Sequence, residues 1–155
     1  MTATLFTQVT DALVSVLSAS LSVDVFDGRP RTLDDKRTGI AVGVDSNLRG
    51  DDAAATLRQV WREAGPAPFA HRDESGELVV SVWSQSGDDD FKPHRDAVAS
   101  ILDDVFEALA PVTTLGIPEL IDLQILDSAN IYQLRTDYGV VVEATFRVAW
   151  RGIFS

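Results

Sequence analysis

Glu77–Leu109, with the sequence ELVVSVWSQSGDDDFKPHRDAVASILDDVFEAL, predicts a strand, a turn and a helix around which the rest of the chain is arranged. Residues 78–84 form a valine-rich apolar run bounded by polar residues, which is typical of a β-strand. Residues 85–90 contain one glycine and three aspartates, which favours a turn. Beyond them the apolar residues recur at helical spacing and predict an amphipathic helix of about five turns.

The composition predicts one folded domain over residues 1–155, with 45% hydrophobic and 24% charged residues. The chain has no cysteine, which excludes disulfides, thiolate nucleophiles and cysteine-ligated zinc. Its net charge is −11, and residues 72–107 hold ten acidic residues against three basic ones. Without a basic stripe, tight nucleic-acid binding is not expected. The N-terminus lacks the pattern of a secretory signal, and no apolar run is long enough to span a membrane, so a soluble protein is expected.

The remaining patterns predict an α+β fold, in which a mainly antiparallel sheet of about four to five strands has helices packed on one face. Residues 53–64 read as a short helix, with Asp51 and Asp52 able to cap its start and Gly65-Pro66 ending it. Its inner face would carry Leu57, Val60, Trp61 and Ala64. The loop at 111–118 is bracketed by two prolines, and 136–139 reads as a turn. The other predicted elements are a helix at 5–17 and strands at 23–26, 38–44, 120–126, 131–135 and 140–151.

The last strand has the clearest pattern, because Val140, Val142, Ala144, Phe146, Val148 and Trp150 alternate with mostly polar residues. At about 3.3 Å per residue, residues 140–151 span roughly 40 Å, which is long for a domain of this size. Such a strand can extend past the core of its own subunit.

Asp88, Asp89 and Asp90 invite two interpretations. Carboxylate oxygens are ligands for divalent cations, so the turn could hold a metal ion. However, three adjacent residues rarely direct their carboxylates at one point, and the spacing of an EF-hand is missing. The favoured interpretation is that one aspartate caps the following helix, the others lie near the positive end of its dipole, and Pro93 occupies the first turn.

The other polar and aromatic candidates favour structural roles. His71 and His94 are the only histidines, no nucleophile or metalloprotease motif accompanies them, and both are expected on the solvated surface. Acidic residues on the polar side of the helix, Asp103, Asp104 and Glu107, are expected to be a solvated face. Trp83 shares its strand face with polar neighbours, so besides packing in the core it could contact a partner.

The order of these segments resembles the tail terminator proteins of long-tailed (siphovirus-type) bacteriophages, especially small members from phages of actinobacteria. The resemblance covers nearly the whole chain and rests on the order and spacing of its segments. After an N-terminal helix, the matching segments are VDVFDGRP at 23–30, IAVGV at 40–44, VVSVWSQSGD at 79–88 leading into the long helix, TLGI at 114–117, YQ at 132–133, Gly139 and the strand 140–151.

The resemblance implies a structural protein without enzymatic activity or cofactors. It would form a hexameric ring at the head-proximal end of the tail, cap the finished tail tube, stop its polymerisation and present a docking surface to the head completion or connector protein. DNA would pass through an acidic lumen without specific binding. The protein would occupy the host cytoplasm during assembly and the virion afterwards.

A ring needs two different complementary patches on each subunit. We expect Arg147 and Arg151 to meet Asp88–Asp90 of a neighbour, with Trp83 as a further interface residue. Three alternatives remain open at this point: a head completion or connector protein, a metal-dependent hydrolase using Asp88–Asp90, and a ligand-binding α+β domain.

Overall fold

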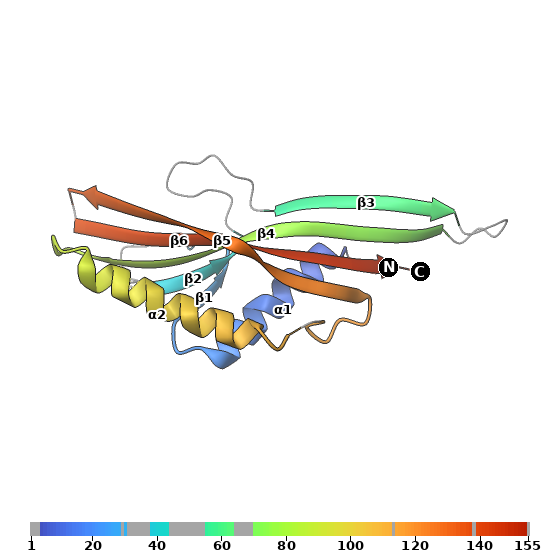
Figure 1. Cartoon of the computed structure of the whole chain (residues 1–155), viewed down its shortest axis with the longest axis horizontal. Helices are drawn as coiled ribbons and strands as arrows, with labels where there is room; N and C mark the ends of the chain where they lie inside the picture. The colour runs from blue at the N-terminus through green and yellow to red at the C-terminus, as the bar shows by residue number, and fades with distance from the viewer. Residues whose placement is uncertain are drawn as a thin grey trace.

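The structure, a computed structural model, describes residues 4–28, 30, 38–43, 55–63, 70–112, 114–137 and 139–154. It confirms the predicted α+β class, with a six-stranded, mostly antiparallel sheet (Figure 1). Strands follow the order β1-β2-β4-β6-β5, β3 pairs with β4 beside this path, and only β1 and β2 are parallel. The elements are α1 (Leu5–Ser20), β1 (Val25–Asp27), β2 (Thr38–Val42), β3 (Ala55–Glu63), β4 (Ala70–Ser86), α2 (Lys92–Leu109), β5 (Leu120–Thr136) and β6 (Gly139–Phe154).

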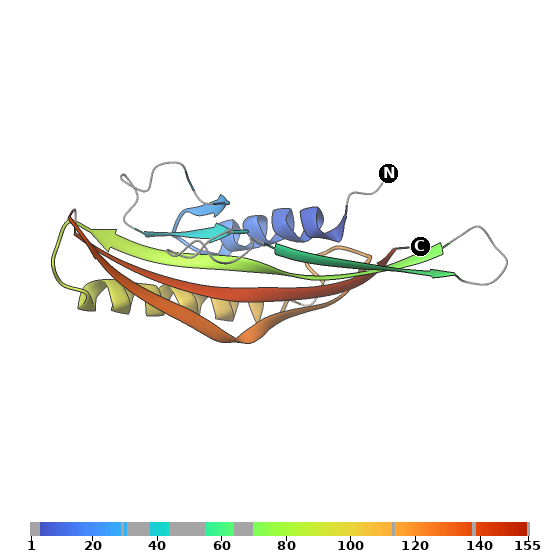
Figure 2. The ribbon, with the colours of Figure 1, turned by 90° about the horizontal axis from the view of Figure 1, so that it is seen from above.

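The two central strands, β4 and β6, are longer than their apolar patterns predict. Residues 72–86 of β4 pair with residues 154–140 of β6 in unbroken antiparallel register, and the two strands run side by side along the length of the sheet (Figure 2). The first part of β4, residues 70–77, is mostly polar, so its sequence lacks a strand pattern. Its extended conformation comes from backbone pairing with β3 on one side and β6 on the other.

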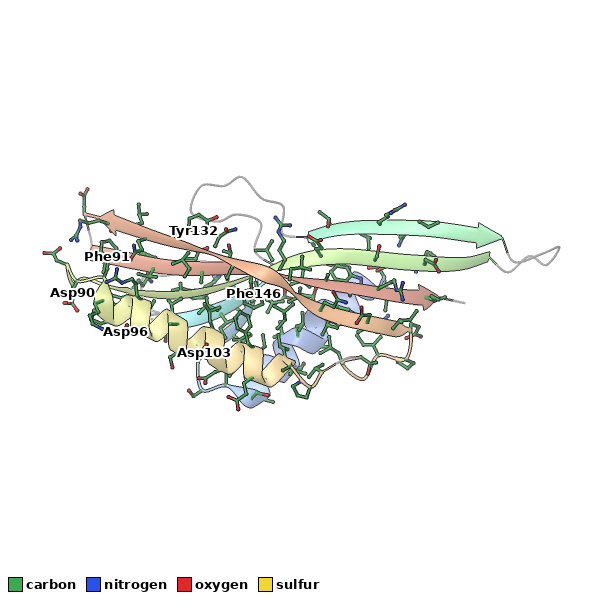
Figure 3. The ribbon with its side chains drawn as sticks, viewed as in Figure 1. Asp90, Phe91, Asp96, Asp103, Tyr132 and Phe146 are labelled. Atoms are coloured by element: carbon green, nitrogen blue, oxygen red, sulfur yellow. The ribbon has the colours of Figure 1, made fainter. Side chains whose placement is uncertain are left out.

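Both helices pack on the same face of the sheet, as predicted, and lie below it in Figure 1. The alternation of β6 places Phe146 on this face, where its ring meets Phe106 of α2 edge-on at 5.3 Å (Figure 3). The single main core lies between this face and the helices. It includes Leu5, Val9, Leu13 and Leu17 of α1, Val98, Leu102 and Val105 of α2, and Leu78, Val80 and Val82 of β4.

The prediction of a helix at 53–64 is wrong, because residues 55–63 form β3 and pair with β4 along their whole length. Leu57 and Val60, expected on the buried side of that helix, are 46% and 37% exposed. The segment contains the β-formers Thr56, Val60 and Trp61, and pairing with a neighbouring strand outweighs a weak helical spacing. The expected caps and stop at 51–52 and 65–66 lie outside the described residues.

Residues 120–136 form the single strand β5, where two strands were predicted. Its register with β6 shifts twice, between Leu120 and Asp122 and between Ile125 and Ala129. The first shift adds one residue to β5 and so reverses the faces on which its residues alternate, and the second adds two residues and interrupts the regular pairing. The strand predicted from the sequence therefore ended at residue 126, although β5 continues to Thr136. The predicted turn at its end is confirmed, since Thr136 pairs with Gly139 across the β5–β6 hairpin.

Two glycines are each covered by a tryptophan on the adjacent strand. Gly39 lies directly opposite Trp83, and a Cβ atom at Gly39 would come within 2.6 Å of Cη2 of that indole. Gly76 lies opposite Trp150 in the same way, with Cη2 at 2.7 Å. The first pair lies on the face away from the helices and the second on the helix face. The small residues Gly39 and Ala41 thus let the Trp83 side chain pack closely on β2.

Candidate interaction surfaces

The three aspartates precede α2 and its N-cap residue Phe91, at the end of the molecule where Figure 3 labels Asp90. The predicted aspartate N-cap is wrong in position, because Phe91 is the N-cap and has no side-chain capping bond; Asp90, one residue earlier, accepts a hydrogen bond from the backbone N–H of Lys92 on its Oδ1 at 3.0 Å. Asp89 accepts one from Arg135 Nη1 of β5 at 3.1 Å, and the Arg135 guanidinium lies 5.0 Å from the centre of the Phe91 ring. The turn thereby joins the end of β5 to the first turn of α2.

This geometry gives no support to a metal site. Within the parts of the chain that the structure describes, no group of three or more histidine or acidic side chains is arranged to hold a cation. Asp88, Asp89 and Asp90 are all exposed, and two of the three make the contacts that fix the helix start.

His94 is buried, with 9% of its surface exposed, so the prediction of a solvated histidine is wrong. Its Nδ1 lies 2.7 Å from Ser84 Oγ and its Nε2 lies 2.8 Å from Ser86 Oγ. Because a hydroxyl can donate or accept, both ring nitrogens are satisfied, and neither is open to a substrate. Ser86 Oγ also accepts the backbone N–H of Asp88 at 3.1 Å, so the cluster ties the end of β4 to the turn and the helix.

The sequence did carry a signal for this burial. His94 lies one helical turn before Val98, in line with the buried residues of α2. Because its side chain is polar, it was not counted with the apolar residues of that face. The side chain of His71 lies outside the described residues. The expected solvated face of α2 is confirmed, because Asp103, Asp104 and Glu107 are exposed, and Asp103 points away from the sheet in Figure 3.

The residues expected at a subunit interface are dispersed over the molecule. Trp83 is 1% exposed and stacks on Phe26 at 5.9 Å, so it is not part of the surface of a single chain. Arg147 Nη1 lies 3.5 Å from Glu77 Oε2 of β4. Arg151 is exposed and lies opposite Asp122 across β5 and β6. Contacts of these residues with a neighbouring copy stay a prediction.

Sequence reasoning missed the role of Glu74, a fully buried carboxylate on β4. Its Oε1 accepts the backbone N–H of Phe6 at 3.0 Å, and its Oε2 accepts Gln59 Nε2 at 3.0 Å. Arg72 Nη2 lies 3.9 Å from the same Oε2. Thr4, the N-cap of α1, makes no side-chain capping bond, so a residue far away in sequence satisfies this helix N-terminus and joins it to β3 and β4.

Exposed aliphatic side chains occur on several strands of the sheet. Leu57 and Val60 lie on β3, Ile121 on β5 and Ile153 on β6, and β3 with the start of β4 projects beyond the helices (Figure 1). Ile131 and Leu134 lie on the second half of β5, near Arg135, which contacts Asp89 of the aspartate turn. Exposed aliphatic groups on strand edges mark surfaces suited to association.

None of the described helices is long and apolar enough to cross a membrane.

No protein-family model and no curated protein matches the chain. Among solved structures, 25 chains match. One belongs to the "Virion of native gene transfer agent (GTA) particle", with 13% identity over 92% of this chain and 84% of that chain and a TM-score of 0.39. A likeness of this strength carries no argument about function.

Proposed function

We propose that this protein is a structural component of a bacteriophage virion, and specifically a tail terminator. In this role copies of the chain form a hexameric ring that caps the completed tail tube, stops its polymerisation and offers a docking surface to the head completion or connector protein. The proposal starts from the sequence resemblance, which runs from the first helix to the last strand. It involves no catalysis and no cofactor.

The structural observation that carries the proposal is the form of the sheet. β3 and the start of β4 project beyond the helices, and on their far sides β3 and β5 have no paired strand among the described residues (Figure 1). Unpaired edges that expose aliphatic side chains are association surfaces, and monomeric proteins usually shorten or cover them. A subunit with such edges is suited to assembly with other subunits.

The charge of the chain agrees with a ring through which DNA passes. With a net charge of −11 and exposed carboxylates along α2, the protein repels phosphate and offers no basic stripe to hold it. A passage lined by such subunits would let DNA move without specific binding. The ion pairs expected between Arg147 or Arg151 and the Asp88–Asp90 turn of a neighbour belong to this proposal as one candidate contact.

Binding to purified tails and to purified heads tests the proposal. We expect the protein to bind one end of tail tubes and to stop elongation when it is added to polymerising tube protein. Binding to DNA-filled heads and not to tails would contradict the tail terminator role and support that of a head completion or connector protein. Binding to neither particle would contradict a role at the head–tail joint.

A further inference from the structure

We propose that β3 of one copy pairs with the first half of β5 of the next copy, so that the sheet continues from subunit to subunit. The inference rests on the proposed function, because it names the contact by which the ring would form. It commits to a second copy of this chain as the occupant of both edges.

The strand directions permit this pairing without inverting a subunit. β3 is antiparallel to β4, β4 to β6 and β6 to β5, so β3 and β5 run in opposite directions at the two edges of the sheet. When a second copy extends the sheet with its helices on the same side, its β3 lies antiparallel to β5 of the first. The two edges differ from each other, so the contact is head-to-tail, and rotation about an axis can close it into a ring.

The charges at the two edges are complementary. On the face away from the helices, one cross-strand row begins at the exposed Arg58 of β3, passes through Ser75 and Arg151, and ends at Asp122 of β5. Continuing that row into a second copy brings Asp122 against Arg58 of the neighbour. The end of the row at β3 is therefore cationic and the end at β5 anionic, which favours β3–β5 contacts over β3–β3 contacts.

The same register matches apolar groups on the opposite face. When Arg58 is opposite Asp122, antiparallel pairing places Leu57 opposite Leu123 on the face that carries the helices. Leu57 is 46% exposed in the single chain, and Leu123 packs at the margin of the main core. A neighbour in this register would remove these aliphatic side chains from water.

Cysteine cross-linking tests the contact cleanly, because the chain contains no cysteine. The pairing places Thr56 opposite Gln124 of the neighbour, and both side chains are exposed. A disulfide requires Cβ atoms about 3.5–4.5 Å apart, so it reports direct strand pairing. The proteins to be oxidised are T56C, Q124C, an equimolar mixture of the two and the double variant, each alone and with purified tail tubes. S100C, at an exposed position of α2, mixed with T56C is the matched control.

We expect the T56C and Q124C mixture to give a covalent dimer of twice the 16.8 kDa chain mass, and the double variant to give a ladder of higher multiples. The separate single variants and the S100C mixture should remain monomeric on denaturing gels. A dimer of T56C alone, a dimer of Q124C alone, or no cross-link with or without tubes would overturn the pairing. Efficient cross-linking between D88C and R151C in place of this pair would assign the interface to the aspartate turn.

Charge reversal gives a second readout that does not depend on oxidation. We expect Arg58→Glu and Asp122→Lys each to weaken self-association by up to about fivefold, the range of an exposed ion pair, and the combination to restore it to within about twofold. Equal weakening in the combined variant would contradict the contact. Six-fold rings on tails without the β3–β5 cross-link would refute the pairing and leave the proposed function standing. Cross-linked oligomers that never cap tails would support the pairing and contradict the proposed function.

Discussion

Replacing Glu74 by alanine should destabilise the protein more than replacing any surface carboxylate. The change removes the acceptor for the Phe6 N–H at the start of α1 and leaves Arg72, whose side chain is 18% exposed, without its nearby carboxylate. A lost N-terminal capping bond costs about 0.5–2 kcal/mol, and removing one member of a buried ion pair costs about 3–5 kcal/mol. Since the 3.9 Å contact with Arg72 is long and partly solvated, we expect the low end, about 3 kcal/mol in total.

Urea and thermal unfolding followed by circular dichroism would measure this loss. For a chain of this length, about 3 kcal/mol corresponds to a decrease in Tm of roughly 6–12 °C. Glu74→Gln keeps one oxygen for the Phe6 N–H, but it removes the charge and places an NH2 group where Oε2 accepts Gln59 Nε2, so it should cost about 1–2 kcal/mol. The ordering of the two variants is as important as the magnitude, because it separates the hydrogen bond to the Phe6 N–H from the other contacts of the carboxylate.

Glu77→Ala is the matched control, because Glu77 lies on the same strand, and its pair with Arg147 at 3.5 Å is about 40% exposed. Exposed ion pairs contribute about 0–1 kcal/mol, so this variant should stay within 1 kcal/mol of the parent protein. If Glu74→Ala and Glu77→Ala unfold at the same urea concentration, Glu74 does not stabilise α1, and the reasoning from the buried contacts fails.

Three further substitutions test other contacts by the same unfolding measurements. His94→Phe should cost about 1–3 kcal/mol, because it leaves the buried hydroxyl of Ser84 without its partner; an unchanged midpoint would show that the serine–histidine cluster does not contribute. Gly39→Ala should cost about 1–3 kcal/mol with Trp83 present and under about 1 kcal/mol in a Trp83→Leu background, and equal losses in both would refute the glycine–indole packing. Asp90→Ala should cost about 1 kcal/mol through loss of the helix cap, and a gain in stability would contradict that role.

Sequence patterns predicted the fold correctly where one face of an element is buried along its length. The apolar alternation of 140–151 and the helical spacing from Val98 to Leu109 match the buried residues of β6 and α2. In both elements burial against the main core imposes the periodicity, so the periodicity can be read from the residues alone.

The errors arose where contacts distant in sequence decide the structure. β3 is extended because it pairs with β4, and neither strand has an apolar face there for the pattern to show. The register shifts in β5 interrupt its alternation and made one strand look like two.

Both buried polar sites were missed for a similar reason. Glu74 meets an N–H group 68 residues away in sequence, and His94 meets hydroxyls of another element. Glu74 can be identified as buried only when its partners are known, whereas the helical position of His94 was the one signal of its burial.

The association surfaces could be predicted only in part. A long last strand was expected, and the structure has one from Gly139 to Phe154, but its alternate residues from Val140 to Trp150 are buried, so the part that projects beyond the helices is β3 with the start of β4 (Figure 1). Which strands form the unpaired edges depends on the order of strands in the sheet. From the sequence, Leu57 and Val60 were placed on the buried side of a predicted helix. Once β3 is placed beside β4, the same two residues become exposed aliphatic groups on an open edge.

Negative-stain electron microscopy of the purified protein, alone and mixed with tail tubes, tests the proposed function most directly. The account predicts six-fold rings, seen end-on, and a single ring at one end of each tube, with tubes that no longer lengthen when more tube protein is added. Tubes that keep growing and carry no added density at either end, at protein concentrations that saturate any binding, would contradict it.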